Sequence, residues 1–203
     1  MQTFIVALRA TLVTLVLTGL LYPLAVTGVA QLVFPHRANG SILVDDKGNE
    51  VGSQLIGQGF ADPAYLHSRP SASSYDAANS SGTNLAPTSK KLQGAIHDAI
   101  AAYRSENGVA PDIEVPADAV TSSASGIDPD ISRENAALQV ARIARARGVA
   151  PERVAAIIEQ HAAGRELGLF GEPRVNVLET NLALDRTFGR PTHMAAGSGS
   201  LAR

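Results

Sequence analysis

Four residues in one polar stretch of the chain include the side-chain types of a serine hydrolase. Ser71 or Ser74 would be the nucleophile, His67 the general base, and Asp76 the carboxylate that orients the base. Neither serine lies in a recognisable strand-to-helix elbow of the kind that exposes a hydrolase nucleophile. The stretch is also rich in serine, which brings such residues together by chance, so the pattern does not favour hydrolysis.

A second polar group lies on one expected helix. Gln139 and Arg142 are three residues apart, and Arg145 and Arg147 follow them. Residues at this spacing share a helix face, so this face could contact an anion or a nucleotide. The alternative is a solvated polar face, which charge patterning by itself favours.

Other signatures of chemistry are missing from the sequence. No G-x-x-x-x-G-K-[ST] loop occurs, no G-x-G-x-x-G follows an expected strand, and the Asp-Lys-Thr-Gly of P-type ATPases is absent. The chain has 0 Cys, and its 5 His show no two-ligand helical spacing, so we expect no metal site. A net charge of -2 offers no broad basic surface, so we expect no nucleic-acid partner.

The elements that must position these residues begin with a long apolar segment. No charged side chain lies between Arg9 and Arg37. A helix over residues 10–34 would be about 37 Å long, against roughly 30 Å of bilayer hydrocarbon. We therefore expect a retained transmembrane helix over about residues 10–34. The alternative is a signal peptide cleaved after Ala30, although its apolar core would be unusually long.

Three expectations concern this helix. Arg9 slightly favours a cytoplasmic N-terminus by the positive-inside rule. Pro23 lacks an amide hydrogen, so we expect a kink near mid-membrane. One face carries small, mildly polar residues, which suggests packing against a partner helix, although threonine is also tolerated in lipid. The residues of this candidate interface are Thr11, Thr14 and Thr18.

After the N-terminal segment 1–36, residues 37–190 have the composition of a single soluble domain. We expect an α+β fold that is mostly helical with a small β-sheet, followed by a flexible tail at 191–203. The predicted strands are 41–44, 51–56 and 174–178, with an irregular segment at 63–87 and a loop at 111–130. One helix is predicted from its cap Thr88 to 107, and a short one at 181–188. Between them, a helix runs from its cap Ser132 to 147, with Ala137, Val140, Ala141 and Ala144 facing inward, and another begins at Pro151, with Val154, Ile157, Ile158 and His161 as its buried edge.

Several stretches occur in a fixed order behind the apolar segment. They are VGSQLIGQGF at 51–60, SRPSASSY at 68–75, SSGTNLAPTSKKL at 80–92, PADAVTSSASGIDPDIS at 116–132 with ALQVARIARARG at 137–148, and GEPRVNVLETNLALD at 171–185. Together they resemble the C subunit of the bacterial Kdp potassium-transporting ATPase. The resemblance covers roughly residues 5–188, and its last stretch is the most specific.

The resemblance implies a non-catalytic accessory subunit of a four-subunit potassium importer in the bacterial inner membrane. Its partners would be a channel-like subunit that carries potassium, a P-type subunit that hydrolyses ATP, and a small membrane peptide, with membrane lipid around the helix. The soluble domain would lie on the periplasmic or extracellular side, seated over the channel-like subunit.

The resemblance also implies a catalytic chaperone that raises the affinity of the P-type subunit for ATP, with Gln139 as the nucleotide contact. These implications conflict, because ATP is cytoplasmic and a domain held outside the membrane cannot touch it. We therefore favour the assembly role, with no firmly bound cofactor, and keep the contact at Gln139 as a hypothesis. The chain departs from the family at Ala124, where the usual glycine would give easier access to positive φ.

Two polar loops are predicted to form part of the partner surface. Residues 69–75 and 82–87 have no expected element to bond their backbone groups, which then need solvent or a partner. We expect substitutions of Arg69 and Asn84 to weaken complex recovery more than thermal stability. The alternative function is a membrane-tethered periplasmic protein that binds a nucleotide or acts as a hydrolase.

Overall fold

The computed structural model describes residues 1–191. The expected flexible tail therefore lies outside the described residues from position 192 onward. The chain divides into two compact units, one formed by Met1–Ile42 and one that begins at Leu43.

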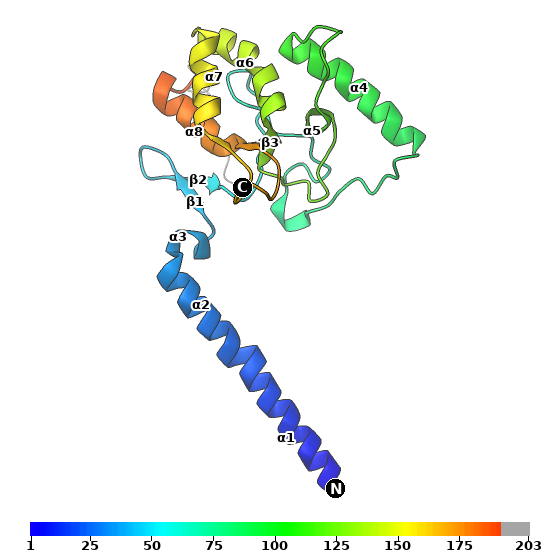
Figure 1. Ribbon diagram of the computed structural model, residues 1–203, viewed down its shortest axis with the longest axis vertical. Helices are drawn as coiled ribbons and strands as arrows, with labels where there is room; N and C mark the ends of the chain where they lie inside the picture. The colour runs from blue at the N-terminus through cyan, green and yellow to red at the C-terminus, as the bar shows by residue number, and fades with distance from the viewer. Residues whose placement is uncertain (192–203) are drawn as a thin grey trace. The chain divides into compact units, whose positions relative to one another are not determined.

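One long helix makes up most of the first unit (Figure 1). It consists of α1 (Gln2–Val16), the π-helical turn η1 (Leu17–Leu21) and α2 (Tyr22–Val33), and the short helix α3 (Pro35–Ala38) follows. No side chain of the long helix is buried. By length and composition, Gln2–Val33 can cross a membrane.

The π-helical turn lies immediately before Pro23, where the sequence predicts a disturbance. The amide of Tyr22 bonds the carbonyl of Leu17, five residues back, in place of the usual four. This wider turn comes at the point where the proline ring supplies no donor. The helix continues through the proline. On the expected polar face, the Thr18 hydroxyl donates to the Thr14 carbonyl at 2.8 Å and is satisfied within the helix.

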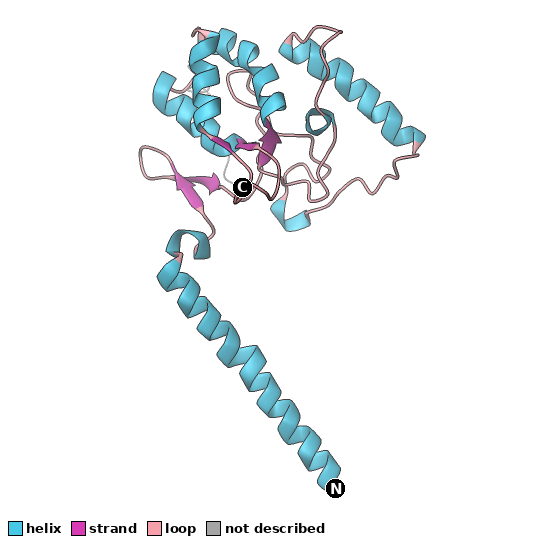
Figure 2. Cartoon of the chain, viewed as in Figure 1, coloured by secondary structure: helices cyan, strands magenta, loops and turns pink. Residues whose placement is uncertain are grey.

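Two small sheets follow the N-terminal helices along the chain (Figure 2). The predicted hairpin is formed by β1 (Ile42–Val44) and β2 (Glu50–Ser53), which ends before the predicted residue 56. A three-stranded antiparallel sheet has the order β3-β5-β4, from β3 (Asp130–Ser132), β4 (Ala162–Ala163) and β5 (Arg174–Asn176). Val175 lies opposite Ile131 on one side and Ala162 on the other.

Helices contribute far more residues to the domain than strands do, which confirms the expected α+β class. They are α4 (Lys90–Asn107), α5 (Ala117–Val120), α6 (Arg133–Arg147), α7 (Pro151–Gln160) and α8 (Val177–Phe188), with a 3-10 turn η2 (Ala77–Asn79). Ser132 caps α6 as predicted, and Gly108 and Gly148 end α4 and α6 in the left-handed conformation that glycine adopts at low cost.

Several predicted boundaries are wrong. Ser89 rather than Thr88 caps α4, because its hydroxyl accepts the amide of Leu92. The segment 111–130, predicted as a loop, contains α5 and the start of β3. The last helix begins four residues early, at Val177, because Asn176 accepts the amide of Glu179 and ends the strand there.

The inward face of α6 agrees with the predicted one at Ala144, which is buried, but not at the other predicted positions. Ala137 and Ala141 are exposed, and Val140 is half-buried. The buried face instead carries three polar or charged side chains together with apolar ones. The buried residues are Asn135, Ala136, Gln139, Arg142, Ile143 and Ala144. An apolar pattern locates a helix face only when the interior is apolar, and here it is not.

Two hydrophobic clusters hold the domain. The larger one joins α6, α7, α8 and the three-stranded sheet around fully buried side chains such as Leu66, Ile143 and Leu184. The smaller one joins α4 and α5 around Tyr103 and Val120. Leu66 belongs to the segment predicted to be irregular, so that segment passes through the core.

Candidate functional site

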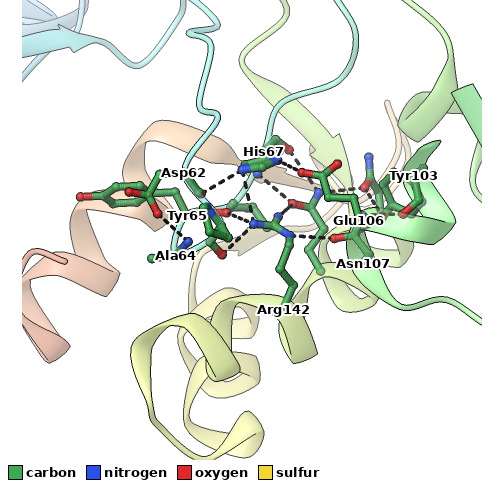
Figure 3. Close-up of polar contacts among 12 residues, drawn as sticks. Asp62, Ala64, Tyr65, His67, Tyr103, Glu106, Asn107 and Arg142 are labelled. Carbon is green, nitrogen blue, oxygen red and sulfur yellow. Dashed lines mark hydrogen bonds and ion pairs between the residues drawn. The ribbon is translucent and has the colours of Figure 1, made fainter. Parts of the chain in front are cut away.

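A network of polar side chains lies in the interior of the domain (Figure 3). It joins residues 62–67, α4 and α6. Gln139, the sequence-based candidate for nucleotide contact, lies in this network and is 1% exposed. The alternative of a solvated polar face at Gln139 and Arg142 is therefore wrong, because both side chains point into the domain.

The amide of Gln139 has no spare hydrogen-bonding capacity. Its Oε1 accepts from the backbone amide of His67 at 2.8 Å and from Arg142 Nη2 at 2.7 Å. Its Nε2 donates to the carbonyl of His67 at 3.2 Å and to Asn135 Oδ1 at 2.9 Å. Two lone pairs and two N–H groups are all that a glutamine side chain offers. In this arrangement Gln139 holds the peptide of His67 and presents no free group to a nucleotide.

Arg142 is buried beside Gln139 and binds main-chain oxygens. Its Nη1 donates to the carbonyls of Pro63 at 2.7 Å and Tyr65 at 3.0 Å, and its Nε donates to Asn107 Oδ1 at 2.9 Å. Burial lowers the pKa of the guanidinium from its ordinary value, and the charge of Glu106 opposes that shift. A charged donor that satisfies several buried carbonyls fixes the course of the segment 63–65.

His67 connects this network to α4. Its Nδ1 lies 2.8 Å from a carboxylate oxygen of Glu106, and its Nε2 lies 2.9 Å from the Asp62 carbonyl and 3.3 Å from Arg142 Nη1. Burial and the Arg142 charge lower the pKa of the imidazole, against the effects of Asp62 and Glu106. His67 therefore has structural partners on both ring nitrogens.

Tyr103 anchors α4 to the start of α6. Its hydroxyl donates to Asn135 Oδ1 at 2.8 Å, and burial raises the pKa of the phenol. Asn107 also contributes to this contact, since its Nδ2 donates to the Tyr103 carbonyl at 3.0 Å and its Oδ1 accepts from Arg142. The interior face of α4 is thus bonded to α6 through side chains.

A second polar cluster contacts the same segment. Arg147 donates to the carbonyl of Ala64 at 2.7 Å, forms an ion pair with Asp185 at 2.9 Å, and lies 5.0 Å from the centre of the Tyr65 ring. The Tyr65 hydroxyl donates to Asp185 at 2.9 Å, and burial together with Asp185 raises the pKa of Tyr65 to about 12. Asn181 of α8 bonds both backbone groups of Leu66.

No role is predicted from the sequence for Asn181, Asp185 or Asn135. Asn181 and Asp185 do lie in the stretch 171–185 that carries the family resemblance. Asn181 is three residues from both Leu178 and Leu184, so it shares a helix face with two leucines. A polar residue on such an apolar face indicates a buried polar group. This spacing is the feature of the sequence that indicates a buried Asn181.

The residues of the hydrolase hypothesis are not brought together. Ser71 donates to the carbonyl of Gly126 at 2.5 Å. Asp76 accepts the amide of Ala78 and caps η2, while His67 faces Glu106. Ser71, Asp76 and His67 each have a separate structural partner, so the structure does not assemble a catalytic triad from these residues. Among residues 1–191, no group of three or more His, Asp or Glu is placed to hold a metal ion.

The loop 69–82 packs on the loop 121–128. Arg69 forms an ion pair with Asp128 at 2.8 Å and donates to the Thr121 carbonyl. The backbone amide of Ser81 donates to the carbonyl of Ser125 at 2.9 Å. Backbone groups of the loop 69–75 also bond within the domain, where solvent or a partner was expected: the Tyr75 amide donates to Ser71 Oγ, and the Arg69 carbonyl accepts the Tyr75 hydroxyl. The contact of Arg69 with a partner stays a prediction.

Gly126, rather than Ala124, has positive φ in this loop pair. At Gly126 a side chain would lie 2.5 Å from Ser73 Oγ, so both the backbone conformation and the space require glycine. Ala124 does not have positive φ, so the alanine at this position, where the family usually has glycine, causes no backbone strain. Asn84 is exposed with a φ of +53°, and its part in a partner surface stays a prediction.

These features define a class of protein. One helix able to span a bilayer precedes an α+β domain whose buried polar side chains bind its own backbone. A family model for KdpC, described as "K+-transporting ATPase, c chain", matches residues 4–186.

Full-length relatives agree with that match. The chain is 56% identical over 205 residues to the potassium-transporting ATPase KdpC subunit of Myxococcus xanthus, covering 99% of this chain and 96% of that protein. It is 47% identical to the KdpC subunit of Koribacter versatilis, covering 94% and 98%, and 52% identical to that of Mycobacterium tuberculosis strain H37Rv, covering 89% and 96%. The chain belongs to the KdpC family, which confirms the resemblance seen in its sequence.

Proposed function

We propose that this chain is an accessory subunit of a potassium-transporting ATPase and acts through protein contacts. Its partners are the channel-like, ATP-hydrolysing and small peptide subunits. The observation that supports this role is the use of Gln139 and Arg142: each binds groups of its own domain, although these side chains were the best candidates for a ligand contact. Family membership supplies the context of the complex.

The helix Gln2–Val33 anchors the chain in the bacterial inner membrane in this proposal. No side chain of the helix is buried in the chain, so its apolar surface needs lipid or other membrane helices. The N-terminus lies in the cytoplasm and the domain on the periplasmic or extracellular side. Thr11, Thr14 and Thr18 remain the candidate contact with a partner helix.

The chaperone effect on ATP binding is indirect in this proposal. A domain outside the membrane cannot touch cytoplasmic ATP, and the amide of Gln139 is saturated. Any increase in ATP affinity is therefore transmitted through contacts with the P-type subunit.

A reporter fused after Phe188 and active only outside the cytoplasm tests the location of the domain. Activity is expected with the wild-type helix. The double variant Leu17→Arg/Leu20→Arg should abolish it together with growth at limiting potassium, because two central arginines cost about 5–7 kcal/mol of insertion. Gln2→Arg, at the end of the helix, is the matched control and should change neither. A reporter active only inside the cytoplasm would contradict the proposed orientation.

A further inference from the structure

Three large apolar side chains are exposed at the turn between β4 and β5. Leu167, Leu169 and Phe170 are 93%, 70% and 61% exposed. None of them belongs to either hydrophobic cluster of the domain. Single exposed apolar residues are ordinary on soluble domains, whereas a contiguous group indicates an interaction site. We call residues 167–170 the apolar tip.

The backbone holds the apolar tip in one conformation. Glu166 and Phe170 exchange both amide-to-carbonyl bonds, at 2.8 and 2.9 Å. Between them, Leu167 has a φ of +53° and Gly168 a φ of +72°. A left-handed conformation costs a leucine about 1–2 kcal/mol, whereas asparagine adopts it more readily. The chain therefore holds a leucine outward where a polar residue would be less strained, and such strain often accompanies function.

Ion pairs fix the base of the apolar tip to the sheet. Arg165 contacts Glu172 at 2.8 Å, across the turn. Arg174 contacts Glu166 at 3.1 Å and Asp130 of β3 at 3.2 Å. A surface that is already ordered loses little conformational entropy when it binds.

The charges around the apolar tip distinguish between kinds of partner. Arg165 and Arg174 are matched by Glu166 and Glu172, and all four are paired. Binding to an anionic bilayer surface uses Lys and Arg that have no such partner. A compact apolar group with a neutral polar rim instead matches the anchor that fills a pocket at a protein interface.

We propose that the apolar tip docks into an apolar pocket on another subunit of the same transport complex. The pocket lies on the side of the membrane that holds the domain. This inference rests on the proposed function and adds to it the surface through which the domain makes its protein contacts.

The triple variant Leu167→Asn/Leu169→Thr/Phe170→Thr tests the docking in the full chain. Recovery of the partner subunits with the tagged chain from detergent-solubilised membranes should fall at least tenfold. The midpoint of thermal unfolding should stay the same or rise, because asparagine relieves the strain at position 167. Leu55→Thr is the matched control, since Leu55 is also exposed, at 58%, and is not part of the apolar tip.

The outcomes separate the two proposals. If the triple variant recovers the partners as well as wild type does, the docking is wrong and the accessory role stands. If the wild-type chain itself recovers no partner subunit, the accessory role fails, and the docking fails with it.

A lipid contact is tested separately with a label at the apolar tip. The chain has no Cys, so Leu169→Cys gives one thiol for an environment-sensitive bimane label. In lipid vesicles, assembly with the partner subunits should shift the emission of the bimane to shorter wavelength, without quenching by spin-labelled lipids. Quenching by those lipids, or no shift on assembly, would overturn the proposal.

Discussion

The side-chain amide of Asn181 brackets the peptide groups of Leu66. Its Oδ1 accepts the Leu66 amide at 2.7 Å, and its Nδ2 donates to the Leu66 carbonyl at 2.9 Å. Gln139 does the same for His67, the next residue, from another helix. Two amide side chains thus take the place of a neighbouring strand for a segment that passes through the core.

Asn181→Ala should lower the free energy of unfolding by about 2–5 kcal/mol. It leaves the amide and carbonyl of Leu66 buried without a partner, and each such group costs about 1–3 kcal/mol. Urea unfolding followed by circular dichroism in detergent measures the change. Lys91→Ala, on the exposed side of α4, should change the free energy by less than about 0.5 kcal/mol. A loss for Asn181→Ala as small as for this control would show that the bracket is not needed.

Gln139→Ala should also destabilise the domain, by about 2–4 kcal/mol, because it leaves the His67 peptide and Arg142 with fewer partners. The assembled complex that remains should bind ATP with wild-type affinity. Unfolding of the chain and nucleotide affinity of the complex are measured side by side. A loss of ATP affinity with unchanged stability of the chain would instead support a direct nucleotide contact.

The stability of the domain should fall as the pH drops below about 6.5. In the unfolded chain an imidazole takes up a proton near that pH. In the folded chain burial and Arg142 lower the pKa of His67, so the unfolded state binds more protons in this window. The stabilisation is complete above pH 6.5 and is lost towards the folded-state pKa.

The variant His67→Gln should reduce this pH dependence between pH 7.5 and 5. Urea unfolding at several pH values measures it. His97→Gln is the matched control, because the side chain of His97 is 87% exposed and the variant should keep the wild-type slope. An unchanged slope in His67→Gln would contradict the assignment of the effect to His67.

Arg69→Met should destabilise the domain by about 1–3 kcal/mol, between the values for exposed and buried ion pairs. The reason is its half-buried pair with Asp128. Recovery of the complex should fall only as far as the lost stability explains, which revises the expectation drawn from the sequence. A double-mutant cycle with Asp128→Asn measures the coupling between the two side chains.

Asn84→Gly is a test of the other predicted contact. Asn84 is exposed and glycine fits its positive φ, so stability should change by less than about 0.5 kcal/mol. A loss of complex recovery would then report a partner contact directly. Unchanged recovery would remove Asn84 from the partner surface.

Much of the fold could be predicted because local chemistry specifies it. Ser132 caps α6, and Gly108 and Gly148 end their helices in the conformation that glycine favours. The apolar edge of α7, at Val154, Ile157 and Ile158, is buried as its spacing indicates. His161, predicted on the same edge, is half-buried and follows the last residue of the helix.

The inward face of α6 could not be predicted in the same way. Its pattern of alanine and valine points to one face, whereas Gln139 and Arg142 are buried on another. A glutamine or arginine is stable inside a protein only when partners satisfy it, and these partners come from residues 63–67, far away in the sequence. No window of sequence around α6 contains that information.

The sequence by itself determined the long apolar helix, the α+β class and the family, because length, periodicity and ordered motifs are properties of the chain. Only the tertiary structure decided what the polar residues do. It assigned Gln139, Arg142 and Asn181 to the backbone of one core segment, and it left Leu167, Leu169 and Phe170 exposed. The physical reason is that burial and hydrogen-bond satisfaction depend on which distant segments meet, whereas helix and turn preferences depend on neighbours along the chain.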